Sequence, residues 1–217
     1  MRNKIFISIL ALFFIFANVQ GVFAETKNEQ EFNKENIINL LEKYNLSYEI
    51  VSNNNIEKNI NSNISSIKEL ENIIVERLNE PSVIDMGEQY FELSDSEINL
   101  LSSRSIAKLS RTQEISNGLY VTYTVSGDWH TRNNIKHWSN CKSAEVSEYS
   151  NAGFTKLGNV NKSVGTVSSD AKKINHTYEY VIKHYIAVPI PGVKDYVHIY
   201  SHSQTVTGTN YFYASSI

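Results

Sequence analysis

The chain has 217 residues, a formal net charge of −3 at pH 7 and a single cysteine, Cys141. One cysteine cannot form an internal disulfide, so the folded chain has to depend on apolar burial and backbone pairing. A net charge this small gives no reason to expect a nucleic-acid partner.

The first 24 residues have the three parts of a secretion signal. Arg2 and Lys4 give a basic start, residues 5–16 are almost entirely apolar, and a small-x-small sequence ends at Ala24. The apolar run is shorter than the ~20 residues that cross a bilayer, and no later stretch is long enough to span one. We therefore expect a signal peptide over residues 1–24 and a secreted, extracellular protein. The Asn, Ile and Lys content suits a bacterium of low GC content.

The remaining chain divides near residue 116 into two parts of opposite charge. Residues 25–116 hold 9 basic and 17 acidic side chains, a net of −8, whereas residues 117–217 hold 9 and 6, a net of +3. Such an asymmetry predicts two structural units. Their opposite charges predict that the acidic N-terminal segment contacts the basic C-terminal unit.

Residues 25–101 are predicted to form an acidic segment of short helices. Apolar side chains at helical spacing indicate one helix over residues 33–44 and another that follows Ser66. Ser66 begins a Ser-x-x-Glu capping box, and Pro81 ends the second helix. A second box at Ser94 predicts a third helix. Helices this short are marginal in water, so they have to pack on another element.

Residues 102–116 are polar and carry scattered basic side chains, as linkers do. The same composition also suits a proteolytic processing site. Cleavage there would make the 25–101 segment a propeptide.

Residues 117–217 are predicted to form an antiparallel β domain. Asn117-Gly118 is a strong hairpin signal, and later segments alternate Tyr, Thr and Val at 8–12-residue spacing. The predicted fold class is α+β, with short N-terminal helices followed by an all-β antiparallel sandwich of immunoglobulin-like architecture. The Cys…Trp…Cys hallmark of that family is absent.

The last long hairpin, residues 177–203, carries the candidate site. A turn at Pro189-Ile190-Pro191-Gly192 predicts pairs whose residue numbers sum to 381. One face is then apolar and directed to the core, with Ile182, Ile186, Val188, Val197 and Ile199. The other face presents aromatic and imidazole side chains, namely Tyr185, Tyr196, His198, Tyr200 and His202.

These five side chains are the predicted ligand-binding residues. Tyrosine offers a flat apolar ring and a hydroxyl with little entropy to lose, which suits a cell-surface glycan or an extracellular protein. Ordinary cross-strand pairing also favours tyrosine and threonine in strands, so the same pattern is compatible with no ligand at all.

Neither a metal nor a cofactor is predicted. His198 and His202 are four residues apart, which is roughly 13 Å along a strand at ~3.3 Å per residue. Two ligands of one zinc ion lie much closer than that. The predicted register places Glu179 opposite His202, so single sites that pair His202 with Glu179, or His184 with Asp195, stay open. The sequence has no glycine-rich phosphate loop, no G-x-S-x-G and no H-E-x-x-H motif.

Three functions stay open on the sequence alone. The first is a secreted, non-enzymatic protein that binds a glycan or another protein through the Tyr/His face. The second is a secreted toxin or effector that its acidic propeptide masks until cleavage. The third is a small hydrolase with an unrecognised site that uses His130, His137 or Cys141.

Overall fold

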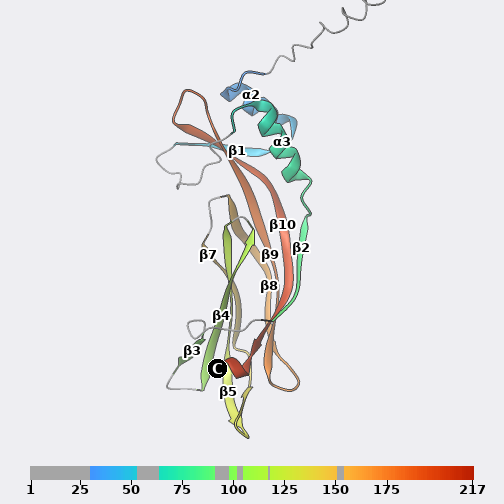
Figure 1. The fold of residues 1–217 in the computed structure, drawn as a ribbon, viewed down its shortest axis with the longest axis vertical. Helices are drawn as coiled ribbons and strands as arrows, with labels where there is room; N and C mark the ends of the chain where they lie inside the picture. Colours follow the sequence, from blue (N-terminus) through green and yellow to red (C-terminus); the bar gives the residue numbers. More distant parts are fainter. Residues whose placement is uncertain (1–29, 53–63, 91–97, 102–104, 117, 151–153) are drawn as a thin grey trace, which may run out of the picture.

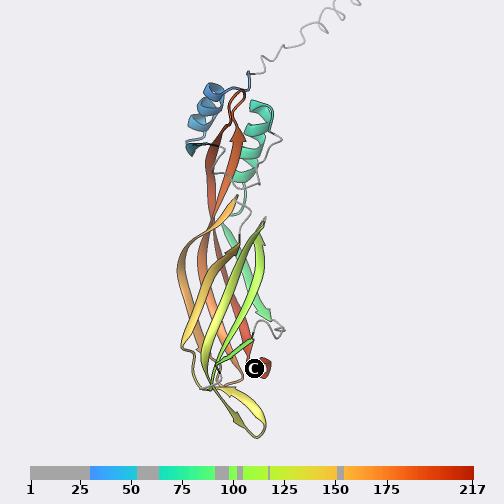
Figure 2. The same ribbon diagram turned by 90° about the vertical axis from the view of Figure 1, so that its left-hand side faces the viewer.

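The structure, a computed structural model, describes residues 30–52, 64–90, 98–101, 105–116, 118–150 and 154–217. The predicted signal peptide, residues 1–24, lies outside the described residues. The described chain forms two β sheets and two α-helices in an elongated molecule, with the helices at one end and the C-terminus near the other (Figures 1 and 2). A mostly β chain with a few helices in its first half is confirmed.

Both well-marked helices form where the sequence predicts them. Helix α2 covers Lys34–Lys43, and the Asn33 side chain accepts a hydrogen bond from its first turn. Helix α3 covers Ile67–Leu78, and Ser66 Oγ accepts from the Glu69 amide at 3.2 Å. These capped ends replace backbone partners that a helix start lacks.

The rest of the 25–101 segment contains strands that we did not predict. They are β1 (Ser47–Ser52), β2 (Val83–Tyr90) and β3 (Ile98–Leu101). The prediction of a third helix is therefore wrong over residues 98–101, which pair antiparallel with residues 106–109. Ser94 lies outside the described residues. Short segments with weak local preference take the conformation that a neighbouring sheet edge offers.

The linker prediction for residues 102–116 is also wrong over most of its length. Strand β4 covers Ile106–Ser116 and pairs along its length with β5, Leu119–Arg132. Ala107 and Leu109 are fully buried, while polar side chains occupy the other face, where Ser110 and Thr112 bond threonines of β5. Half of an amphipathic strand is polar, and this half resembled a linker. The two strands pair antiparallel up to Ser116 opposite Leu119, where the hairpin is predicted, and Asn117 itself lies outside the described residues.

The larger sheet, sheet A, is built around the two longest strands. Strand β9 (Lys173–Pro189) pairs with β10 (Asp195–Tyr213) on one side and β8 (Thr155–Val167) on the other. The free edge of β10 takes two strands of the first segment. Strand β1 pairs antiparallel with residues 195–200, and β2 pairs parallel with residues 205–211.

The second sheet, sheet B, is antiparallel and contains β3, β4 and β5. The far end of β5 forms a hairpin with β6, Ile135–Trp138, and its near end pairs with β7, Ser143–Ser150. Side chains from both sheets form one core, so the sheets pack face to face. This core contains the inward residues Leu109, Val121, Tyr123, Tyr180, Ile182, Val206 and Phe212, among others. The immunoglobulin-like architecture stays a prediction.

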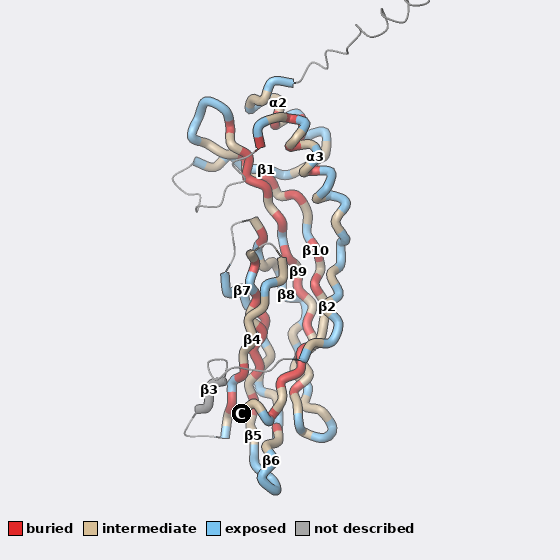
Figure 3. Tube along the Cα trace, viewed as in Figure 1, coloured by how far each residue is buried: buried red, intermediate tan, exposed pale blue. Residues whose placement is uncertain are grey.

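A separate core lies under the helices at the other end of sheet A. The turn-proximal halves of β9 and β10 extend beyond sheet B, and α2 and α3 pack on them there (Figures 1 and 3). This core contains Ile37, Leu41, Ile67, Leu70 and Ile74 from the first segment, with Ile186, Val188, Val197 and Ile199 from the hairpin. The first segment thus contacts the hairpin mainly through apolar side chains rather than through net charge.

Candidate functional site

The predicted hairpin forms, but its register differs from the prediction. Tyr200 lies opposite Tyr185 and Val197 opposite Val188, so the paired numbers sum to 385 instead of 381. The centre of the turn therefore lies two residues later than predicted, between Gly192 and Val193. Ile190 continues this pairing, because its amide donates to Asp195 O. A shift by an even number leaves each side chain on the face that we predicted.

The burial pattern of this hairpin therefore confirms the prediction. The five apolar side chains Ile182, Ile186, Val188, Val197 and Ile199 are no more than 1 % exposed. Four of the predicted ligand-binding residues lie on the opposite face and are partly exposed: Tyr185, Tyr196, His198 and Tyr200. We call these four the Tyr/His face.

The rings of the Tyr/His face pack largely on one another. Tyr185 stacks on His198 with centroids 4.7 Å apart and lies 5.8 Å from Tyr200. His198 Nδ1 is 3.0 Å from a Glu49 carboxylate oxygen on β1. Burial raises the pKa of the Tyr185 hydroxyl. Ring faces used for internal stacking are less free to hold a ligand, so ordinary cross-strand pairing explains much of this pattern.

His202 does not belong to the Tyr/His face, so its predicted place on that face is wrong. The ladder contains a bulge between Tyr200 and His202, and the extra residue is Ser201. A bulge turns the following side chain to the opposite face. His202 consequently pairs with His184, and Glu179, its predicted partner, lies opposite Thr207. The sequence carries no proline or glycine at this position that could have marked the bulge.

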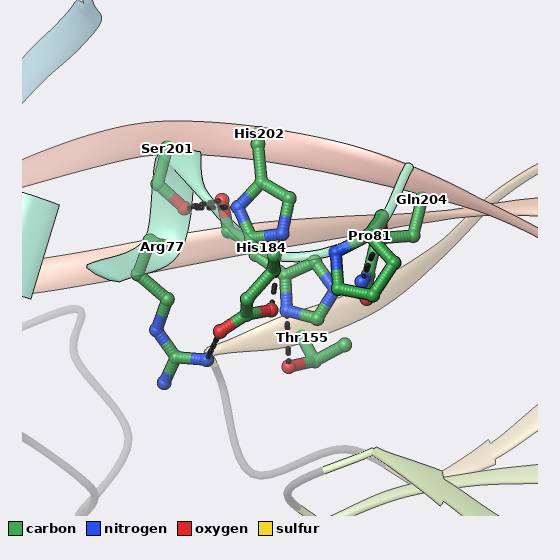
Figure 4. A network of polar contacts seen from close by, with 8 residues as sticks. Arg77, Pro81, Thr155, His184, Ser201, His202 and Gln204 are labelled. Carbon is green, nitrogen blue, oxygen red and sulfur yellow. Dashed lines mark hydrogen bonds and ion pairs between the residues drawn. The ribbon is translucent and has the colours of Figure 1, made fainter. Parts of the chain in front are cut away.

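The bulge creates a cluster that we call the His–Glu junction: Glu80, His184 and His202. The two imidazole rings stack with centroids 4.4 Å apart and planes inclined by 3°. Glu80 comes from the turn between α3 and β2, and its Oε2 lies 3.2 Å from His202 Nε2. Figure 4 shows the two imidazoles with Pro81 and Gln204 next to them. One ligand atom from each of the three residues lies within 4.8 Å of the others.

The junction is part of a wider polar network that joins the helices to the hairpin. His184 Nε2 is 2.8 Å from Gln204 Oε1, and Gln204 donates to Pro81 O at 2.6 Å. Arg77 bonds the other Glu80 oxygen at 2.7 Å. Burial lowers the pKa of both histidines, and for His202 the Glu80 carboxylate partly opposes this shift. Both imidazoles are therefore favoured in the neutral form.

An open cavity of about 310 Å³ lies on the outer face of sheet A, further from the helices. We call it the outer pocket. Its lining comes from β2, β8, β9 and β10: Asp85, Gly87, Glu88, Lys162, Thr177, Tyr178, Glu179, Thr207, Gly208 and Thr209. Asp85, Thr207, Glu179 and Lys162 follow one another across four paired strands, so their side chains share this face.

Two glycines shape the outer pocket. Gly87 has a φ of +61° at the irregularity in the β2–β10 ladder. Its amide donates a hydrogen bond to the Asp85 carboxylate. L-residues rarely adopt this backbone conformation, which glycine tolerates. Gly208 lies opposite Tyr178, and a Cβ at that position would lie only 2.5 Å from the tyrosine hydroxyl. The sequence alone gave no signal that brings these two glycines together.

The outer pocket is rich in hydrogen-bond acceptors. It contains three carboxylates and one ammonium group, so its formal charge is negative. One oxygen of Asp85 accepts a hydrogen bond from the Gly87 amide, and one oxygen of Glu179 accepts a hydrogen bond from the Asn161 side chain. Hydrogen bonds from Tyr211 and then Tyr90 lower the pKa of Glu88. Anionic oxygens on rigid strands can accept hydrogen bonds from a polyhydroxylated or cationic ligand.

The side chains proposed for a hydrolase do not form an activated nucleophile. His130 and His137 stack on each other across the β5–β6 hairpin with centroids 5.7 Å apart. Cys141 Sγ donates to Ser143 O, and burial raises the pKa of its thiol. A reactive cysteine needs the opposite shift, toward the thiolate.

Comparison with known protein families, with characterised proteins and with solved structures found no match to this chain. Neither α2 nor α3, the α-helices of the described part of the chain, has the length and apolar character that crossing a membrane requires.

Proposed function

We propose that the protein is exported and acts as a non-enzymatic binding protein that holds a glycan in the outer pocket. The observation that carries this proposal is the row of Asp85, Thr207, Glu179 and Lys162 across four strands of a concave surface. The cavity volume lies near the lower limit of ~300 Å³ for small-ligand sites. Sheet strands hold such side chains more rigidly than loops do.

The chemistry of the outer pocket supports a sugar. Sugar hydroxyls donate to carboxylates and exchange hydrogen bonds with threonine hydroxyls, while Lys162 can donate to sugar oxygens. Tyr90, which is 60 % exposed, lies beside Glu88 and bonds it at 3.0 Å. One face of this ring stacks on Tyr211 with centroids 4.6 Å apart, and its exposed part, next to acceptors, suits the apolar face of a pyranose.

The ionised state of Glu88 supports binding without hydrolysis. A glycosidase needs one carboxylic acid with a raised pKa to protonate the leaving group. The lowered pKa of Glu88 favours a permanent acceptor over a proton donor.

Two further features belong to the same proposal. The two-sheet core supports a sandwich, for which we keep the immunoglobulin-like architecture as a proposal. The 25–101 segment supplies β1, β2 and the two helices, so its removal would expose the edge of β10 and the core beneath the helices. We therefore favour an intact protein that starts at Glu25 over the masked toxin, and intact-mass measurement of secreted material distinguishes them.

Glycan-array binding followed by calorimetry tests the proposal. The double variant Asp85→Asn/Glu179→Gln keeps both side-chain shapes and one acceptor oxygen on each residue but removes both charges. It should weaken glycan binding at least tenfold. Glu145→Gln, an exposed carboxylate on β7, is the matched control and should bind as the parent does. Tyr196→Ala should also leave binding intact.

Two results would contradict this assignment. The first is a parent protein that binds no glycan on the array. The second is glycan binding that survives in the double variant and is lost with Tyr196→Ala, which would return the site to the Tyr/His face.

A further inference from the structure

The His–Glu junction occupies a gap in the strand pairing of sheet A. Along its outer edge, β10 pairs with β1 up to Tyr200 and with β2 from Thr205. The turn between α3 and β2 crosses the residues between them. Thr205 donates its amide to Ser82 O at 2.8 Å, and Gln204 bonds Pro81 O. These bonds hold Glu80 beside His202.

The spacing of the three side chains fits a metal ion. Tetrahedral zinc has bonds of ~2.0–2.1 Å, which places its ligand atoms about 3.4 Å from one another. Glu80 Oε2 and His202 Nε2 are already 3.2 Å apart, and one ligand atom of His184 lies within 4.8 Å of both. The imidazole planes are now parallel, so the two rings have to tilt toward each other to bind one ion. His184 and His202 lie opposite each other on paired strands. They therefore avoid the ~13 Å separation along one strand that prevents His198 and His202 from sharing an ion.

The surroundings of His202 Nε2 also support an ion. This nitrogen is buried and faces Glu80 Oε2 at 3.2 Å, in a geometry that falls short of a hydrogen bond. Buried polar atoms without a partner are rare and require an explanation such as an absent ion. A divalent cation would bind this nitrogen and the adjacent carboxylate oxygen together.

The surrounding groups can orient the ligands. His202 Nδ1 lies 3.2 Å from Ser201 Oγ, and His184 Nδ1 lies 3.4 Å from Thr155 Oγ1. Hydroxyls at the far nitrogen of an imidazole hold the ring that binds metal through its other nitrogen. On metal binding His184 Nε2 would exchange its bond to Gln204 for the ion. Arg77 occupies one Glu80 oxygen and its charge opposes a cation, which limits the affinity.

We propose that Glu80, His184 and His202 bind a divalent late first-row metal ion of the zinc class, with water completing the coordination. Two imidazoles and one carboxylate are typical ligands of Zn²⁺, whereas Ca²⁺ and Mg²⁺ prefer oxygen alone. The ion would tie the turn that follows α3 to the bulge in β10. Because it binds only the folded chain, it would raise the thermal stability of the protein.

Zinc titration of the untagged chain from Glu25 to Ile217, stripped with a chelator, tests this site. Calorimetry should show one equivalent of Zn²⁺ bound, with a higher Tm and no comparable effect of Ca²⁺ or Mg²⁺. His202→Asn should weaken zinc binding at least about tenfold, the least that loss of even an outer-shell partner costs. His198→Asn removes a histidine from the same strand and should change nothing.

A second variant keeps the test decisive if His202→Asn fails to fold. Glu80→Gln affects a partly exposed side chain and keeps the Arg77 contact available, so it should fold and still lose affinity for zinc. No zinc uptake by the folded parent protein overturns the proposal. Equal loss of binding in His198→Asn and His202→Asn also overturns it. Glycan binding in the outer pocket is measured separately, so either proposal can fail alone.

Discussion

His176 should make the protein less stable in mild acid. Its side chain is fully buried beside Tyr123, Tyr178 and Phe212. Ser163 donates its hydroxyl to Ala144 O, so it can only accept the hydrogen of His176 Nε2, at 2.9 Å. His176 Nδ1 has no partner within the described structure. The folded protein therefore holds a neutral imidazole, and burial lowers its pKa to about 4.

The magnitude follows from the difference between the two states. In the unfolded chain the histidine pKa is ~6.5, so between about pH 6.5 and 4 the unfolded state binds one more proton than the folded state. Stability is then lost as the pH falls through this window and becomes constant below it. At ~1.4 kcal/mol per pH unit, His176 alone removes about 3 kcal/mol of unfolding free energy.

Urea unfolding of the parent protein and His176→Gln from pH 7.5 to 4 measures this contribution. Glutamine keeps a donor for Ser163 but does not titrate, so the variant should be less stable at pH 7.5 by about 1–3 kcal/mol. The difference between the two proteins should shrink or reverse by about 3 kcal/mol at pH 4. A difference that stays constant with pH, or a His176 NMR titration with its midpoint near 6, would refute the reasoning.

Three more predictions test the packing. Tyr123→Phe and Tyr180→Phe should each lower the unfolding free energy by about 1–3 kcal/mol, because the two hydroxyls bond each other at 2.7 Å in the core. The double variant should lose less than the sum of the two single losses, and urea unfolding measures all three. Gly165→Ala should cost about 1–3 kcal/mol because its Cβ would overlap Cys141 Sγ, and adding Cys141→Ala should restore part of that loss. Ile74→Ala should cost about 2–5 kcal/mol in thermal unfolding by leaving a cavity under α3; an unchanged Tm would mean that the helices contribute little.

The sequence predicted those features that depend on local pattern. The helical spacing of apolar side chains located both helices, and the capping box at Ser66 marked the start of the second, because both are local signals. The alternation of β9 and β10 separated the apolar face from the Tyr/His face. An even error in register preserved these faces, so the burial prediction held although the pairing was wrong.

The missed features depend on contacts between distant residues. Strands β1 and β2 form because the edge of β10 is available, and neither has a strong local signal. The bulge at Ser201 moved His202 to the opposite face and created the His–Glu junction. The outer pocket requires β2 to lie parallel to β10, a pairing that spans more than a hundred residues. No spacing rule within one strand could have predicted these sites.

The double use of the β10 edge has a consequence for how the chain folds. In the described structure β1 and β2 pair only with β10, which follows all the other described strands in the chain. Until β10 has been synthesised, two early segments lack their hydrogen-bonding partner, and such long-range closure is slow. Assembly of this edge of sheet A therefore has to wait for β10. A delay of this kind suits the export that we propose, because a chain that has not yet folded can be threaded across a membrane.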